Sequence, residues 1–115
     1  MTTLGELQAR CARTTLSRTE PEASHNERLA MAALWLTSEA GEVATEVRKA
    51  IVAREDWSAI RYRLTAELGD LLWCLSEVAS LAGIDLERAG CSVDLVRKVR
   101  THDRKAAEAA AKEKP

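Results

Sequence analysis

The chain has 115 residues, a formal net charge of −1 and 46% hydrophobic residues. This length fits one domain with a modest core, and the near-zero charge excludes the basic field that attracts nucleic acid. No apolar run reaches the roughly 20 residues that span a bilayer. Residues 1–16 contain no apolar signal core, so we expect a cytoplasmic protein without a membrane partner.

Helical periodicity runs along most of the chain, and no segment shows the alternation with period 2 that predicts strands. The predicted helices span residues 4–16, 27–54, 57–81 and 92–105, with a short turn at 85–88. Residues 17–26 are polar and contain Pro21, which predicts a loop. Ser24 or Asn26 is suited to cap the helix that follows.

These elements predict an all-α, four- to five-helix bundle. We expect one domain over residues 1–105, followed by a flexible tail rich in Ala, Glu and Lys at 106–115. The tail has good helix propensity but no large apolar anchor, so it should fray. Three scattered cysteines without a CxxC motif argue against a disulfide framework and against a zinc site.

Two pairs of carboxylates dominate the two longest predicted helices. Glu39 and Glu42 are three residues apart, and Glu67 and Asp70 repeat this spacing, with a glycine inside each pair. Residues at i and i+3 lie on one face of a helix, so each pair projects in one direction. Four carboxylates brought together repel unless a cation lies between them. The pairs therefore indicate a hard-metal site for Mg²⁺ or Mn²⁺.

The apolar stripes of these helices predict how the pairs meet. At about 100° per residue, each stripe holds seven apolar residues and carries its carboxylates at its margin. The stripes consist of Leu29, Ala33, Leu36, Ala40, Val43, Val47 and Ala50, and of Ile60, Leu64, Leu68, Leu71, Leu75, Val78 and Ala82. Face-to-face packing would place the acidic edges side by side at the rim of the core. The competing interpretation of each pair is a solvated face that contacts Lys or Arg.

Three residues near the carboxylate pairs have roles that the sequence leaves open or assigns to another subunit. Glu46, one turn past Glu42, is either a fifth ligand or the partner of a nearby basic residue on its own helix, Lys49 or Arg48. Trp35 either stacks on a base or packs in an interface. Trp73 points away from the stripe of its helix, so we expect another subunit to bury it.

These motifs resemble those of the MazG-like all-α nucleoside triphosphate pyrophosphohydrolases. That family's signature is ExxE, a gap of one to two dozen or so residues, and ExxD; here 24 residues separate Glu42 from Glu67. Residues 36–43, 67–73 and 83–86 look like the family's L-x-x-E-x-G-E turn, E-L-G-D turn and G-I-D-L connector. The similarity covers roughly residues 28 to 100.

The resemblance implies Mg²⁺-dependent cleavage of (deoxy)nucleoside triphosphates between the α and β phosphates, in nucleotide-pool house-cleaning. It also implies a helical core completed by dimerisation, often as a dimer of dimers. Carried over by position, the metal ligands and catalytic residues are Glu39, Glu42, Glu67 and Asp70, with Mn²⁺ as an alternative ion. Glu39 would help to deprotonate the attacking water through a bound water.

The resemblance also assigns cations to the phosphates. Lys49 matches the family's lysine two turns after the first acidic pair, and the family's N-x-x-K-x-x-R aligns with Asp94, Arg97 and Arg100. Arginine in place of lysine still binds phosphate, with a forked geometry. Asp94 places a negative charge where the family has a neutral group. This departure keeps open an alternative, a non-catalytic helical module that binds a nucleotide or a partner protein.

Overall fold

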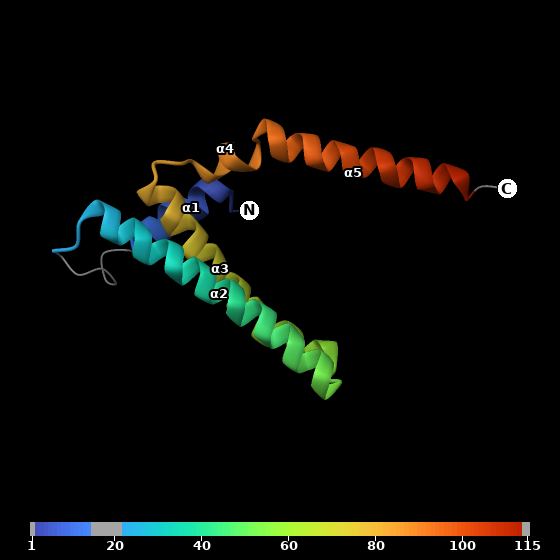
Figure 1. The fold of residues 1–115 in the computed structure, drawn as a ribbon, viewed down its shortest axis with the longest axis horizontal. Coiled ribbons are helices and arrows are strands. Elements are labelled where there is room, and N and C mark those ends of the chain that lie inside the picture. The colour runs from blue at the N-terminus through green and yellow to red at the C-terminus, as the bar shows by residue number, and fades with distance from the viewer. Residues whose placement is uncertain (1, 15–21, 114–115) are drawn as a thin grey trace.

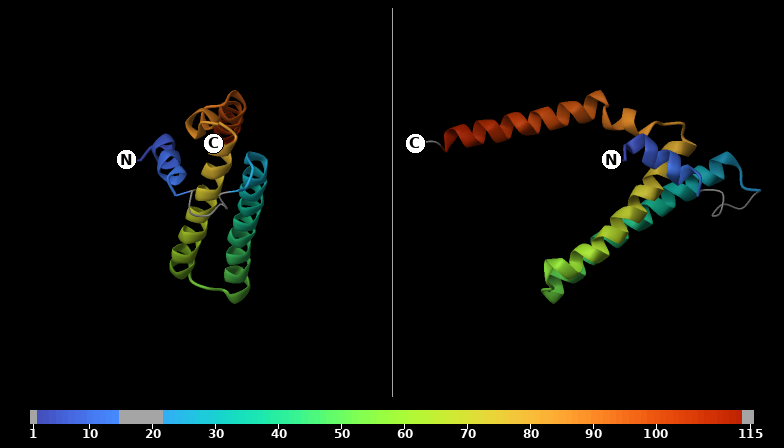
Figure 2. Two further views of the ribbon diagram at one scale, coloured as in Figure 1. Left: turned by 90° about the vertical axis from the view of Figure 1, so that its left-hand side faces the viewer. Right: turned by 180° about the vertical axis from the view of Figure 1, so that it is seen from behind.

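The computed structural model describes residues 2–14 and 22–113, which contain five helices (Figure 1). They are α1 Leu4–Ala12, α2 His25–Ala53, α3 Trp57–Leu81, α4 Leu86–Gly90 and α5 Val93–Lys112. No strand occurs in these two ranges, so the predicted all-α fold is confirmed. The long helices α2 and α3 form an antiparallel hairpin, and α1 packs against α3 and α4. Helix α5 extends away from the hairpin (Figure 2).

Side-chain caps fix where most of these helices begin. The Ser24 hydroxyl accepts a hydrogen bond from the Glu27 amide at 3.2 Å, and the Glu27 carboxylate accepts one from the Ser24 amide, forming a capping box. Ser92 stands at the N-cap of α5, where its hydroxyl accepts a 3.3 Å hydrogen bond from the Leu95 amide. Asp56 stands at the N-cap of α3, but its carboxylate accepts a 2.7 Å hydrogen bond from the Ser58 hydroxyl instead.

Three predicted helix ends differ from the structure by two residues or more. Helix α1 ends at Ala12, four residues early, and α2 begins at His25 rather than residue 27. Helix α5 continues to Lys112, past the predicted end at 105, because its alanine-rich sequence has high helix propensity. The predicted loop at 17–26 lies partly outside the described residues. The domain boundary after residue 105 stays a prediction.

The contact face between α2 and α3 overlaps the predicted stripes and extends towards the carboxylates. Its buried positions include Ala32 and Ala50 on α2, and Ile60 and Cys74 on α3. At about 100° per residue, these positions lie within roughly 20° of the directions of Glu39 and Glu67. Glu39 and Glu67 beside this face are half-buried and Asp70 is exposed, so these carboxylates lie at its solvent edge. This placement agrees with the predicted rim position.

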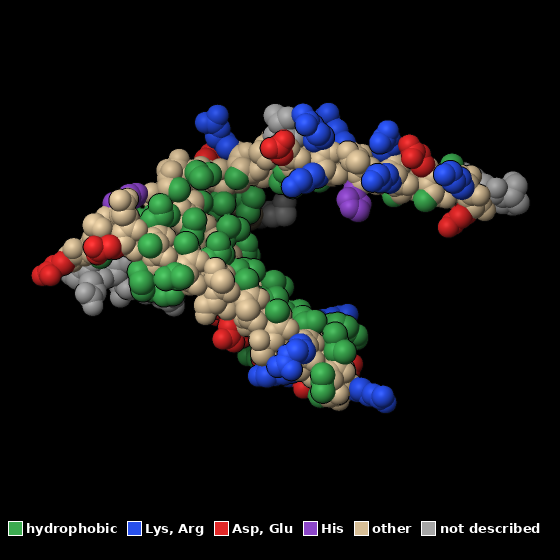
Figure 3. All heavy atoms as spheres, viewed as in Figure 1, with side chains coloured by type: hydrophobic (Ala, Val, Ile, Leu, Met, Phe, Trp, Pro, Cys, Tyr) green, Lys and Arg blue, Asp and Glu red, His purple; other side chains and the backbone are tan. Residues whose placement is uncertain are grey.

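The leucine side of α3 remains uncovered in the single chain. Leu68, Leu72 and Leu75 are 44%, 42% and 41% exposed and follow one another on one helix face. Hydrophobic side chains are prominent over the face shown in Figure 3. The accessible surface is 8996 Å², whereas a folded 12.6 kDa monomer typically exposes roughly 6,200 Å². One chain thus leaves much apolar surface in water.

Gln8 ties α1 to the corner between α3 and α4. Its side-chain amide donates a 2.7 Å hydrogen bond to the Ile84 carbonyl, and its oxygen accepts one of 2.9 Å from the Leu86 amide. The same amide donates to the Ser80 hydroxyl at 3.2 Å. This one side chain therefore fixes the place from which α4 and α5 depart.

Trp73 has its polar partner inside its own chain. Its indole nitrogen donates a 2.7 Å hydrogen bond to the Thr14 hydroxyl, which follows α1, and the ring is half-buried. The expectation that another subunit buries the rest of Trp73 stays a prediction. The periodicity of α3 shows that Trp73 faces away from α2, but it does not show that α1 packs there.

Candidate metal centre

Three carboxylates from the two long helices converge between them. One oxygen from each of Glu39, Glu67 and Asp70 lies within 4.8 Å of the other two. Glu39 and Glu67 are half-buried and Asp70 is exposed, so the cluster opens to solvent on the Asp70 side. Oxygens this close match the separations around one hard divalent cation, whose bonds to oxygen are about 2.0–2.6 Å.

The glycines beside these carboxylates stand in open space. A Cβ atom added to Gly41 or Gly69 would meet no atom within 4 Å. Glycine inside a helix costs roughly 0.5–1 kcal/mol relative to alanine. No contact within the described chain explains that cost. Both positions therefore leave room at the site for a ligand or for another chain.

Electrostatic strain is concentrated on Glu67. Burial is the largest cause that raises the pKa of Glu67, and the charges of Glu42, Asp70, Glu39 and Glu46 raise it further, in that order. Glu42 is exposed and is not among the three converging carboxylates, but its charge reaches the cluster. A cation bound among these groups would relieve the repulsion.

Glu46 belongs to a separate ion pair. Its carboxylate accepts a 3.0 Å hydrogen bond from Arg63 Nε on α3, and Arg63 Nη2 also bonds Glu55 in the turn between the helices. Of the two interpretations of Glu46, the structure shows the salt bridge. Its partner comes from the facing helix instead of Lys49 or Arg48. The sequence contained a usable signal, because Arg63 precedes Glu67 by one turn on the same edge.

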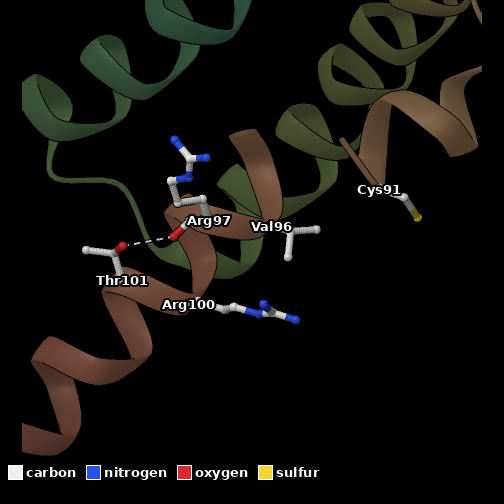
Figure 4. A pocket seen from close by; sticks show the side chains of 5 residues that line it. All are labelled: Cys91, Val96, Arg97, Arg100 and Thr101. Carbon is white, nitrogen blue, oxygen red and sulfur yellow. Dashed lines mark hydrogen bonds between the residues drawn. The ribbon is translucent and has the colours of Figure 1, made fainter. Parts of the chain in front are cut away.

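The three predicted phosphate-binding cations do not join the carboxylates within one chain. Lys49 is exposed and lies about 15 Å along α2 from Glu39. Arg97 and Arg100 lie on α5, which leaves the hairpin, and line a hollow of ≈ 460 Å³ with Cys91, Val96 and Thr101 (Figure 4). Figure 4 shows the two guanidinium groups pointing in different directions. Their role in binding phosphate stays a prediction.

Trp35 is half-buried on α2, one helical turn before Glu39. This position is beside the carboxylates, and it agrees with both base stacking and interface packing. Each interpretation remains a prediction.

Comparison with known proteins identifies the family of this chain. A family model described as the MazG nucleotide pyrophosphohydrolase domain matches residues 28–106, a range that contains all four predicted carboxylates. Neither the curated proteins nor the solved structures include a match. None of the described helices is long and apolar enough to cross a membrane. With a match over more than half of its length, the chain belongs to the MazG nucleotide pyrophosphohydrolase family.

Proposed function

We propose that this protein is a Mg²⁺-dependent nucleoside triphosphate pyrophosphohydrolase that releases a nucleoside monophosphate and pyrophosphate. The observation that carries the proposal is the convergence of Glu39, Glu67 and Asp70 inside a chain of this family. The donor set fits the ion, because it consists only of carboxylate oxygens. Burial, and then the repulsion between these carboxylates, raises the pKa of Glu67. Mn²⁺ would fit the same donors.

The residues that would hold the ion are Glu39, Glu67 and Asp70, with Glu42 one turn further along α2. A bound Mg²⁺ neutralises phosphate charge and lowers the pKa of the water that it binds. Glu39 would help to accept a proton from the attacking water; its half-buried position beside Glu67 and Asp70 supports this role. Its carboxylate would hold that proton while pyrophosphate leaves.

The proposed enzyme works as an oligomer. A second copy that packs on Leu68, Leu72 and Leu75 would cover the apolar face that one chain exposes. Sedimentation equilibrium should give a dimer or tetramer, and Leu72→Lys should shift it to monomer. A monomeric native protein would refute this part of the proposal.

The test of the reaction is a pyrophosphate-release assay across a panel of NTPs and dNTPs with Mg²⁺. The expected products are monophosphate and pyrophosphate in equal amounts, without free phosphate. Preference for deoxynucleotides would support a house-cleaning role in the cytoplasmic nucleotide pool. Tight binding of the Mg²⁺-nucleotide without turnover would instead favour the non-catalytic module, which the charge of Asp94 keeps open.

A further inference from the structure

An arginine borders the carboxylate cluster on the side towards the turn of the hairpin. Arg63 precedes Glu67 by four residues on α3, which places it one turn, about 6 Å, along the helix. Its guanidinium group bonds Glu46 on α2 at 3.0 Å and Glu55 in the turn. We call the carboxylates along this hairpin the acidic row; it consists of Glu39, Glu46, Glu55, Glu67 and Asp70. Arg63 separates the members that it pairs, Glu46 and Glu55, from the three that converge with one another.

Glu46 lies on the same helix face as the proposed ligands, but its carboxylate is held in an ion pair. It lies two turns after Glu39 on the α2 face that meets α3, and its side chain is only 18% exposed. Its charge reaches Glu67, but its oxygens are not among those that converge with Glu39 and Asp70. The group that Glu46 faces across the interface is the Arg63 guanidinium.

We propose that Arg63 is a positioning residue of the metal centre, which holds Glu46 out of coordination and confines the ion to the Glu39–Glu67–Asp70 end of the row. The inference rests on the proposed function, since it assumes that the cluster binds a divalent ion. A planar guanidinium group is suited to this task, because it bonds two carboxylates at once and stays charged at all relevant pH values. Without it, Glu46 becomes a free carboxylate whose charge acts on Glu67.

Titration of the full-length protein with Mn²⁺, followed by electron paramagnetic resonance, measures both affinity and the number of ions per chain. Arg63→Gln should bind Mn²⁺ about three- to tenfold more tightly and take up an additional ion, because one positive charge is lost and one carboxylate is freed. In Glu46→Gln/Arg63→Gln, the extra ion should disappear. A residue that merely supports the fold would not change the number of ions.

Arg104→Gln is the matched control. Arg104 pairs with Glu108 at 3.9 Å on the exposed surface of α5, so this variant loses the same charge from an Arg–Glu pair outside the hairpin. It should keep the native Mn²⁺ affinity and ion number. Arg63→Lys keeps the charge and the fold, but lysine lacks the fork that bonds two carboxylates, so its Mn²⁺ affinity should lie between those of the native protein and Arg63→Gln.

The outcomes separate this inference from the proposed function. A native protein that binds no Mn²⁺ would overturn the metal centre itself. Native binding combined with an unchanged ion number in folded Arg63→Gln would overturn the role of Arg63 alone. An extra ion that persists in Glu46→Gln/Arg63→Gln would also overturn it, since the freed carboxylate would not be the cause. If Arg63→Gln does not fold, Arg63→Lys replaces it in the test, and a native Mn²⁺ affinity in Arg63→Lys would overturn the role of Arg63.

Discussion

The acidic row between α2 and α3 has two parts with the same residue types and different partners. Near the turn of the hairpin, Glu46 and Glu55 both bond Arg63. In the next part of the row, Glu39 faces Glu67, and burial and the surrounding carboxylates raise the pKa of Glu67. One arginine thus makes the difference between a salt bridge within the chain and carboxylates that need a cation from outside. An acidic pair on a helix becomes a candidate site when the facing helix supplies no such cation.

The largest expected effect comes from removing a carboxylate from the unpaired part. Glu67→Gln should reduce pyrophosphate release by at least about a hundredfold, because loss of groups that only orient metal ligands already costs 10- to 100-fold. Steady-state assays with Mg²⁺ and the preferred triphosphate measure this. Glu108→Gln, an exposed carboxylate on α5, is the control and should keep native activity. Retention of more than a tenth of the native rate in Glu67→Gln would contradict the assignment.

Mg²⁺ or Mn²⁺ should stabilise the native fold through the same carboxylates. At a concentration of 100 times the Kd, binding adds about 2.7 kcal/mol to the free energy of unfolding, and the midpoint should rise by several degrees. Thermal unfolding followed by circular dichroism, with and without metal, measures the shift. Glu67→Gln should lose most of it, whereas Arg104→Gln should keep it. An equal shift in native protein and Glu67→Gln would place the ion elsewhere.

The raised pKa of Glu67 makes the metal-free stability depend on pH. The folded state binds this proton more tightly than the unfolded chain, where the pKa is near its ordinary value of 4.5. The stabilisation from Glu67 is therefore full below that value and is lost as the pH rises through the folded pKa. Urea unfolding at a series of pH values should show this loss in the native protein. Glu67→Gln should lack this loss. The free energy of unfolding of the native protein minus that of the variant should therefore fall as the pH rises. A difference that rises with pH would mean that the fold lowers the pKa of Glu67.

The smallest expected effect lies in the paired part of the row. Glu55→Gln should lower the free energy of unfolding by less than about 1 kcal/mol, because both side chains of this ion pair are partly exposed and Arg63 keeps Glu46. Urea unfolding at neutral pH measures this change. A larger loss would show that the turn depends on this pair more than its exposure indicates.

Periodicity within a single helix predicted most of the fold. The bounds of α3 and the cap at Ser24 agree with the structure, because capping residues and helical spacing are local signals. The spacing of the carboxylates also predicted that Glu39, Glu67 and Asp70 meet. Helix bounds and caps depend on residues close together in the sequence, so they can be predicted without knowing which element packs beside the helix.

The rest depended on contacts between elements. The apolar stripe of α3 is broader than one neighbouring helix covers, so the stripe did not determine which part faces α2. The pairing of Arg63 with Glu46 required the register of two helices, and the partner of Trp73 required the position of α1. A helical wheel gives the direction of each side chain, but it does not give the element that lies in that direction.

The bonds of Gln8 bear on the order in which the chain is completed during synthesis. Gln8 joins residues 84 and 86, which leave the ribosome more than seventy residues later. Until then the side chain of Gln8 lacks its two backbone partners, although α1 can already contact α3. Helix α1 is thus made earlier than α3 and α4 but gains its full set of hydrogen bonds only after Leu86 has emerged.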